Sequence, residues 1–216
     1  GGTGALTLEG CTFESIAVLQ PSLGNHVGVF YITGGFDVNV RDSIFDRLSS
    51  STTSAQYAGA FFHARDRGYM FERNIVRNIS EKALIIGGNS SGSTTVRNCL
   101  FYNINADTWA AIGGYNTTFN VYDCTFDNCS AAFSTDNGGT FGTFYNCSVS
   151  HGGALNKYTL SNRLILKSVN VYNTPMSNVD AVASSGLTTY DPLYANRAGE
   201  DFRLRVVSPL VDIGSN

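Results

Sequence analysis

The sequence predicts an all-β chain wound as a right-handed, single-stranded parallel β-helix of about seven coils with a C-terminal extension. Three observations predict this fold: a short recurring motif, strict alternation of apolar and polar residues around it, and a composition suited to tight turns. Of the 216 residues, 43% are hydrophobic and only 14% are charged. Asn, Ser, Thr and Gly fill the difference, and these residues favour turns because they tolerate left-handed backbone or bond locally.

The recurring motif is an apolar residue, any residue, an Asn/Asp-like residue, a Cys-like residue, any residue and an apolar residue. Successive copies are 32, 31, 25, 25, 23 and 22 residues apart. The shorter spacing fits three short strands and three turns, because each strand residue advances the chain ~3.3 Å. The longer first steps indicate loop insertions near residues 17–27 and 49–59. The Cys-like position is occupied by Cys11, Ser43, Asn74, Cys99, Cys124, Cys147 and Val169.

Alternation assigns side chains to the interior of the coil, because successive side chains of a strand point to opposite faces. We call the Cys-like position and the residue before it the motif centre. On the strand before each motif centre, the inward residues include Val38, Val40, Phe119, Val121, Leu164 and Leu166. On the strand after it, they are Phe13, Phe45, Val76, Phe101, Phe126, Val149 and Val171.

Two columns of residues interrupt the alternation and are predicted to form bends. The first bend column suits a single left-handed residue and consists of Gly10, Asp42, Arg73, Asn98, Asp123, Asn146 and Ser168. The second consists of Asn78, Asn103, Asn128 and Asn173, whose stacked amides can hydrogen-bond from coil to coil. After this second bend the chain turns inward at Ile16, Leu48, Ile79, Ile104 and Cys129.

The repeat signal divides the chain into coils over residues 1–175 and a closing segment over residues 176–216, packed on the solenoid and covering its lower end. The chain enters a strand almost at once, without a residue run that could cap the upper end. Because an uncapped end exposes strand edges and core, we expect further coils, another domain or a partner to precede Gly1 in the parent protein.

The repeated motif resembles that of the right-handed parallel β-helix superfamily of pectate lyases, phage tailspikes and bacterial surface proteins. The close of the chain, Tyr190 to Tyr194 followed by Asp201 to Leu204 and Ser208 to Gly214, resembles the ending of many secreted Bacteroidetes-type β-helix proteins. Gly152 to Leu155 and the Cys-x-Phe copies are more weakly similar to polymorphic outer-membrane protein repeats. The resemblance implies a secreted or cell-surface bacterial protein and a polysaccharide ligand.

Charge and cysteine content narrow the partners. The formal net charge of −3 does not favour binding to nucleic acid, and no apolar run approaches the ~20 residues of a membrane span.

The chain has five cysteines, so at least one is not in an intramolecular disulfide. Cys99, Cys124 and Cys147 form one inward file, which favours buried thiols over a metal site because metal ligands must converge. A disulfide between neighbours in the file is sterically open, since adjacent coils lie ~4.8 Å apart.

Several aromatic residues are candidates for glycan binding. The outward column beside the first bend reads Glu9, Arg41, Glu72, Arg97, Tyr122, Tyr145 and Lys167, so two tyrosines stack between cations. Tyrosine faces can stack on pyranose rings. The alternative is that the column has only a structural role and stabilises the sheet through contacts between neighbouring strands. Trp109, Tyr57 and Tyr115 are expected near one edge, beside Gly-rich loops, where Trp109 could equally cover the core.

A catalytic alternative rests on the densest charge cluster, around His63, Arg65 and Arg67. A lyase acting on uronates needs a cation to neutralise the carboxylate and a base for the α-proton. Arg65 or Arg67 could supply the cation, and His63 or Lys82 the base; the simpler interpretation is a solvated turn. The resemblance also implies a calcium site in the pectate-lyase branch, but the carboxylates here do not cluster, so no metal or other cofactor is predicted.

Glycoside hydrolysis needs two carboxyl groups facing one bond. The nearest pair is Asp123 and Asp127, and Asp123 is committed to the first bend. His26 and His151 stand isolated in the sequence and are expected in a bend or loop. The favoured function is therefore a β-helix that binds polysaccharide without cleaving it. A polysaccharide lyase or hydrolase, and an adhesin or tailspike-like structural spacer, are the alternatives.

Overall fold

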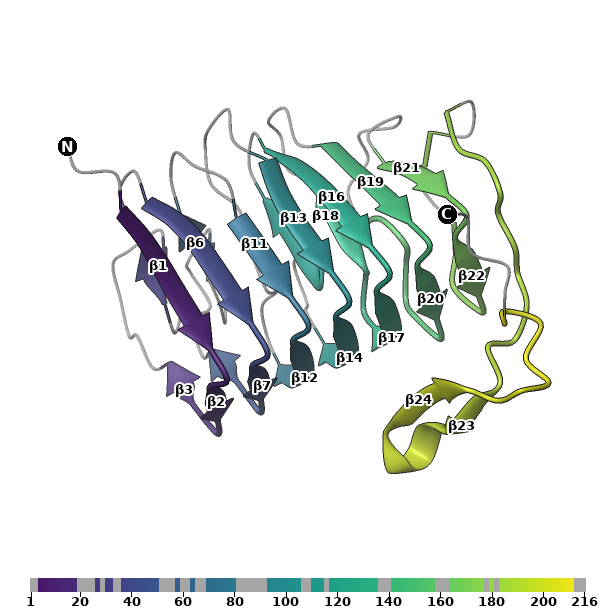
Figure 1. Ribbon diagram of the computed structural model, residues 1–216, viewed down its shortest axis with the longest axis horizontal. Coiled ribbons are helices and arrows are strands. Elements are labelled where there is room, and N and C mark those ends of the chain that lie inside the picture. Colours follow the sequence, from purple (N-terminus) through teal and green to yellow (C-terminus); the bar gives the residue numbers. More distant parts are fainter. Residues whose placement is uncertain are drawn as a thin grey trace.

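The computed structural model describes residues 4–18, 26–27, 30–32, 36–50, 57–58, 63–64, 69–80, 93–105, 110–114, 117–135, 141–157, 164–176, 179–180 and 183–211. Nearly all of the regular structure in these ranges is β-strand, paired in parallel and stacked into sheets, with no α-helix (Figure 1). The predicted all-β class is confirmed, and the arrangement is compatible with a parallel β-helix.

One seven-stranded sheet contains the strand that precedes each motif centre. We call it the first sheet, and every neighbouring pair in it is parallel. Its strands, in spatial order, are β1 (Gly4–Glu9), β6 (Phe36–Arg41), β11 (Tyr69–Glu72), β13 (Ser93–Arg97), β16 (Thr118–Tyr122), β19 (Phe141–Tyr145) and β21 (Leu164–Lys167).

The second sheet contains the strand that follows each motif centre, again in parallel pairs. Its main path is β2 (Thr12–Glu14), β7 (Ile44–Asp46), β12 (Ile75–Ser80), β14 (Leu100–Asn105), β17 (Thr125–Cys129), β20 (Ser148–Ser150) and β22 (Asn170–Tyr172). Two short strands, β3 (Ala17–Val18) and β8 (Ser49–Ser50), extend the sheet beyond the second bend.

Three further parallel pairs are short. They are β15 (Ile112–Gly114) with β18 (Phe133–Thr135), β5 (Tyr31–Ile32) with β10 (His63–Ala64), and β4 (His26–Val27) with β9 (Tyr57–Ala58). Each again joins equivalent parts of neighbouring repeats, so stacking in register also occurs outside the two main sheets.

Both predicted bend columns are confirmed by backbone geometry. All seven residues of the first bend have φ between 50° and 62°. The four asparagines of the second bend have φ between 45° and 53°, and Ser15, Arg47 and His151 adopt the same conformation in the remaining repeats. One left-handed residue per bend turns the chain between sheets without breaking the hydrogen-bonded stack.

The interior follows the predicted faces. Every inward residue predicted for the two sheets is at most 3% exposed, except Phe13, which is partly buried in the first repeat. Aromatic rings continue the stack through the core: the Phe101 and Phe126 rings are 4.8 Å apart and nearly parallel, and Phe13 and Phe45 are 5.0 Å apart. Stacking of the same inward columns from repeat to repeat buries the apolar side chains that stabilise the chain.

The Cys-like column forms a single inward file, as predicted. The Cys99 amide donates to the Cys124 sulfur at 3.4 Å, and the Asn74 amide donates to the Cys99 sulfur at the same distance. All five cysteines are free thiols, so the open disulfide alternative is not realised. Burial raises the pKa of the Cys124 and Cys129 thiols well above its ordinary value.

The closing segment first adds hydrogen bonds below the last repeat. Backbone amides of Asp180, Ser185 and Thr188 donate to carbonyls of Leu164, Leu166 and Val169 at 2.8–3.1 Å. This part of the segment covers the lower end of both sheets. The chain then turns back along the outside of the second sheet, which the sequence did not predict (Figure 1). There β23 (Tyr194–Asn196), the 3-10 turn η1 (Arg197–Gly199) and β24 (Asp201–Leu204) form the C-terminal hairpin.

The thiol file gives a first prediction. Because only the thiolate reacts with a disulfide reagent and Cys99, Cys124, Cys129 and Cys147 are at most 3% exposed, the native protein should react through Cys11 alone. Titration with Ellman's reagent should release one equivalent rapidly, and five in denaturant. Cys11→Ser should abolish the rapid equivalent; rapid reaction of a second thiol would contradict the buried file.

The stacked asparagines of the second bend give a second prediction. The Asn103 amide donates to Asn78 Oδ1 at 3.1 Å and accepts from Asn128 at 2.9 Å. Asn103→Ala should destabilise the protein by about 2–3 kcal/mol, combining left-handed strain of ~1–2 kcal/mol with loss of two exposed hydrogen bonds. Asn103→Gly keeps the backbone conformation and should cost clearly less. Urea unfolding curves measure the difference, and equal losses would show that backbone strain plays no part.

Candidate functional site

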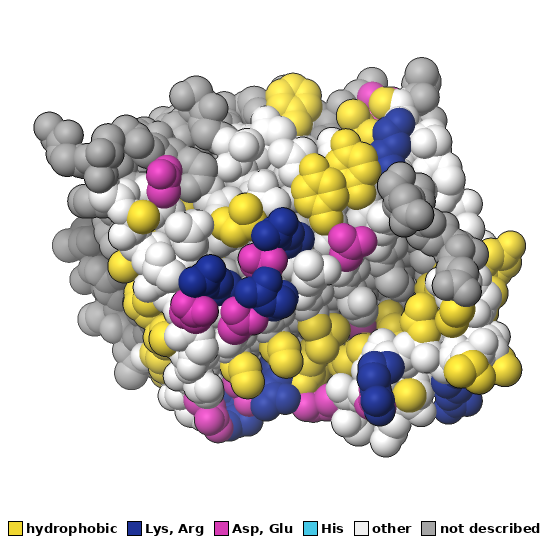
Figure 2. Space-filling model, in the orientation of Figure 1, with side chains coloured by type: hydrophobic (Ala, Val, Ile, Leu, Met, Phe, Trp, Pro, Cys, Tyr) yellow, Lys and Arg dark blue, Asp and Glu magenta, His cyan; other side chains and the backbone are white. Residues whose placement is uncertain are grey.

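The structure brings two predicted binding residues together on the outer face of the first sheet. Tyr122 and Tyr145 pair across β16 and β19, and their rings stack 4.9 Å apart at an interplanar angle of 10°. Both are partly exposed, and we call them the tyrosine pair. Figure 2 shows hydrophobic side chains on this face beside clustered basic and acidic ones. An exposed aromatic ledge of this kind can stack on the apolar face of a sugar ring.

The rest of the outward column is confirmed in register, and the charged residues that precede the tyrosine pair form ion pairs with one another. Arg41 contacts Glu9 at 2.8 Å, and Glu72 accepts from Arg97 at 2.9 Å and from Arg73 at 2.5 Å. Glu72 is only 9% exposed, so the charges there serve the sheet. The tyrosine pair therefore lies between this ion-pair network and Lys167, which pairs in register with Tyr145 on the next strand.

The other proposed binding and catalytic residues cannot be placed as a site. Trp109, Tyr115, Arg65, Arg67 and Lys82 lie outside the described residues. Tyr57 and His63 are placed by their backbone alone, in β9 and β10, each paired with the preceding repeat. The lyase assignment and these three aromatic assignments stay predictions.

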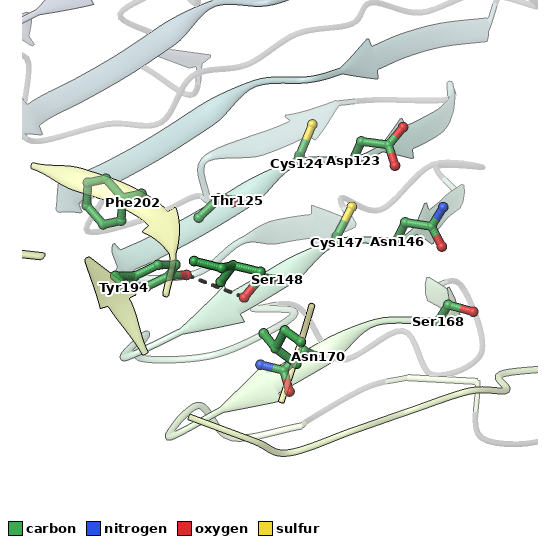
Figure 3. A pocket seen from close by; sticks show the side chains of 12 residues that line it. Asp123, Cys124, Thr125, Asn146, Cys147, Ser148, Ser168, Asn170, Tyr194 and Phe202 are labelled. Atoms are coloured by element: carbon green, nitrogen blue, oxygen red, sulfur yellow. Dashed lines mark hydrogen bonds between the residues drawn. The ribbon is translucent and has the colours of Figure 1, made fainter. Parts of the chain in front are cut away.

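A groove lies beside the first bend, between it and the C-terminal hairpin, with a volume of about 230 Å³. One side is formed by the bend residues Asp123, Asn146 and Ser168; Tyr194 and Phe202 face them from the hairpin (Figure 3). The floor is the outer face of the second sheet, at the start of β17, β20 and β22. We call this the lateral groove. Tyr122 and Tyr145 immediately precede Asp123 and Asn146, so the groove and the tyrosine pair flank the same bend.

The hairpin is held on the second sheet by a buried carboxylate that the sequence did not single out for this role. Asp127 is 2% exposed and accepts from Arg197 Nε at 2.7 Å and from Ser150 Oγ at 2.8 Å. His151 Nδ1 lies 2.9 Å from the same carboxylate. The Tyr194 hydroxyl, 3.1 Å from Ser150 Oγ, extends the network into the hairpin.

This network corrects one interpretation and informs another. His151 occupies a bend, as expected, but it is not isolated, because it reaches Asp127 in the preceding repeat. The serine bonds the carboxylate directly and not the imidazole, so the three residues lack the order of a nucleophile, base and orienting acid. Asp127 is committed to positioning the hairpin, which removes it from the pair with Asp123 considered for hydrolysis.

A second cluster fastens the far end of the hairpin. Arg77 contacts Glu200 at 2.7 Å and the buried Asp46 at 3.1 Å. Burial raises the pKa of Asp46, but the hydrogen bond from Asn78 and the charges of Arg77 and Arg47 outweigh it, so the pKa lies below its ordinary value. Burial also raises the pKa of Tyr102, whose ring lies 4.9 Å from that of Phe202 at a tilt of 41°, to about 12. Sequence spacing gives no signal for these contacts, because residues 194–204 lack the repeat.

A second hollow follows the second bend and includes Asn103 and Asn128. The amides of these residues already bond each other, so they offer a ligand little. Among the described residues no group of three His, Cys, Asp or Glu side chains is arranged to hold a metal. Within the same ranges no helix is long and apolar enough to cross a membrane.

Comparison with known proteins assigns no family. A scan against protein-family models found none that matches the chain. A search of curated proteins found no match either.

The Asp127 network gives a third prediction. Asp127→Ala removes the carboxylate that accepts from Arg197 and Ser150 and should loosen the hairpin, at a cost of about 1.5–3 kcal/mol, the range for hydrogen bonds to a charged group. Hydrogen exchange should then show faster exchange in residues 194–204 while the first sheet stays protected. Asp201→Ala, which removes an exposed pair with Arg203, is the matched control and should change neither. Unchanged protection of the hairpin in Asp127→Ala would contradict the assigned anchor.

Proposed function

We propose that this chain is part of a right-handed parallel β-helix that binds a polysaccharide at a bacterial cell surface or outside the cell, without cleaving it. The stacked, partly exposed tyrosine pair is the observation that carries the proposal. A flat parallel sheet repeats its outward positions every ~4.8 Å, so successive sugar units can follow the stack of repeats. Fold alone does not support the proposal, because one architecture hosts many functions.

The surrounding chemistry favours binding over cleavage in the described part of the chain. The ion pairs of the outward column are engaged with each other, and the buried Asp127 is engaged with the hairpin. Neither group is free to act as an acid or base on a substrate lying over the tyrosine pair. A non-catalytic surface that recognises several sugar units by stacking fits this arrangement.

The test is a double substitution of the tyrosine pair. A glycan array first identifies a ligand of the wild-type protein, and calorimetry then gives its affinity. Tyr122→Ala with Tyr145→Ala should weaken binding roughly 30-fold, since each ring contributes about 1 kcal/mol beyond its buried area. Tyr122→Phe with Tyr145→Phe retains both rings and should stay within about threefold of wild type.

Two outcomes would count against the proposal. If the double alanine variant binds as well as wild type while remaining folded by circular dichroism, the glycan lies elsewhere. If the protein converts polyuronates into unsaturated products, and His63→Ala or Arg65→Ala abolishes this, the lyase alternative replaces non-catalytic binding.

A further inference from the structure

The lateral groove has chemically different walls. The C-terminal hairpin and the tail contribute Tyr194, Phe202, Leu204 and Leu210, an aromatic and aliphatic wall. The opposite rim is polar and follows the first bend. A pyranose ring has the same asymmetry, with apolar C–H faces and a polar edge, so one sugar unit matches the groove in chemistry.

Much of the polar lining is already used by the protein. The Asn170 amide donates to the Tyr190 carbonyl at 2.9 Å, and its oxygen accepts from Thr188 and from the Tyr190 amide, each at 2.9 Å. The Tyr194 hydroxyl is shared with Ser148 at 3.4 Å (Figure 3) and with Ser150 at 3.1 Å. These groups shape the groove and have little capacity left for a ligand.

Asp123 is the exception. It is exposed on the rim, and its carboxylate has no hydrogen bond or ion pair within the described residues. Asp42 occupies the same bend position three repeats earlier, where Arg73 of the next repeat donates to it at 2.7 and 2.8 Å. That contact lowers the pKa of Asp42 below its ordinary value. The residue that follows Asp123 in the column is the neutral Asn146, so this carboxylate lacks the cation that Asp42 has.

No cationic side chain among the described residues neutralises the negative charge of Asp123. The residues that line the groove include no Lys, Arg or His. Arg97, one repeat before, is paired with Glu72 at 2.9 Å. Lys167 lies two repeats beyond, and it forms no ion pair with Asp123. In Figure 3 Asp123 and Asn146 lie on the side of the groove opposite Tyr194 and Phe202, and their side chains point away from these two rings.

We propose that the lateral groove is a subsite for an amino sugar, and that Asp123 selects it by binding the protonated amino group at the rim. This inference rests on the proposed polysaccharide-binding function and names the class of sugar. The ring enters beside Phe202 and Tyr194, while neighbouring units of the chain cross the bend to the tyrosine pair. A uronate would instead place its carboxylate against that of Asp123 and is disfavoured.

The experiment compares two probes that differ in the charge on nitrogen: a β-1,4-linked glucosamine tetramer and its fully N-acetylated counterpart. Calorimetry at pH 6 and low salt should show the amine form binding about tenfold more tightly to the wild-type protein, the expected range for one charge-assisted hydrogen bond. Asp123→Asn should remove this preference without unfolding the bend, because Asn98 and Asn146 adopt the same left-handed conformation.

A second variant tests the charge without touching the carboxylate. Asn146→Arg should place a guanidinium next to Asp123, as Arg73 stands next to Asp42, and should also abolish the preference. Asp42→Asn, at the equivalent and already paired position, is the matched control and should leave the preference intact. Thermal unfolding of each variant verifies that the fold is retained.

The outcomes separate this inference from the proposed function. Equal binding of the two tetramers, or a preference that survives Asp123→Asn, overturns the amino-sugar subsite. If glycan binding sensitive to the tyrosine pair persists in that case, the proposed function stands without the subsite. If neither tetramer binds at all, the subsite is again overturned, and the glycan array alone decides the proposed function.

Discussion

One left-handed residue at the first bend of every repeat is the constraint on which the rest of the structure depends. It changes the direction of the chain between the two sheets within a single residue. The Cys-like residue that follows therefore always points inward, and the residue that precedes always points outward. Because the constraint recurs in all seven repeats, with φ between 50° and 62°, all the remaining columns of side chains are in register as well.

The backbone strain of the left-handed conformation is relieved in different ways at different positions of the first bend column. Glycine, asparagine, aspartate and serine adopt it with little strain or with local hydrogen bonds, whereas Arg73 does not belong to this group. Arg73 bonds Asp42 in the preceding repeat and contacts Glu72 beside it. These contacts offset the strain and give the column an ion-pair network. Where the following repeat supplies Asn146 in place of arginine, Asp123 has no ion pair within the described residues.

Most of the repeat architecture could be predicted from the sequence because its information is local. A period of two residues assigns faces, and a single break in that period marks each bend, so Phe101, Asn98 and Cys99 each received the correct place. Because the repeats stack in register, a correct alignment of one repeat also assigns the equivalent positions in its neighbours. The outward column with the tyrosine pair was predictable for the same reason, since pairing in register carries it from strand to strand.

The contacts of the hairpin could not be predicted, because they join residues with no shared period. Asp127 is outward by alternation and would be expected in solvent, yet Arg197, 70 residues further along the chain, covers it. His151 meets that carboxylate only through stacking of repeats. The lateral groove depends on both kinds of information at once. Its rim is set by the repeated bend, and its apolar wall exists only because a non-repeating segment folds back over the second sheet. The shape and charge of the groove can therefore change through the hairpin or one bend residue while the stacked core stays the same, because neither contributes a side chain to the core.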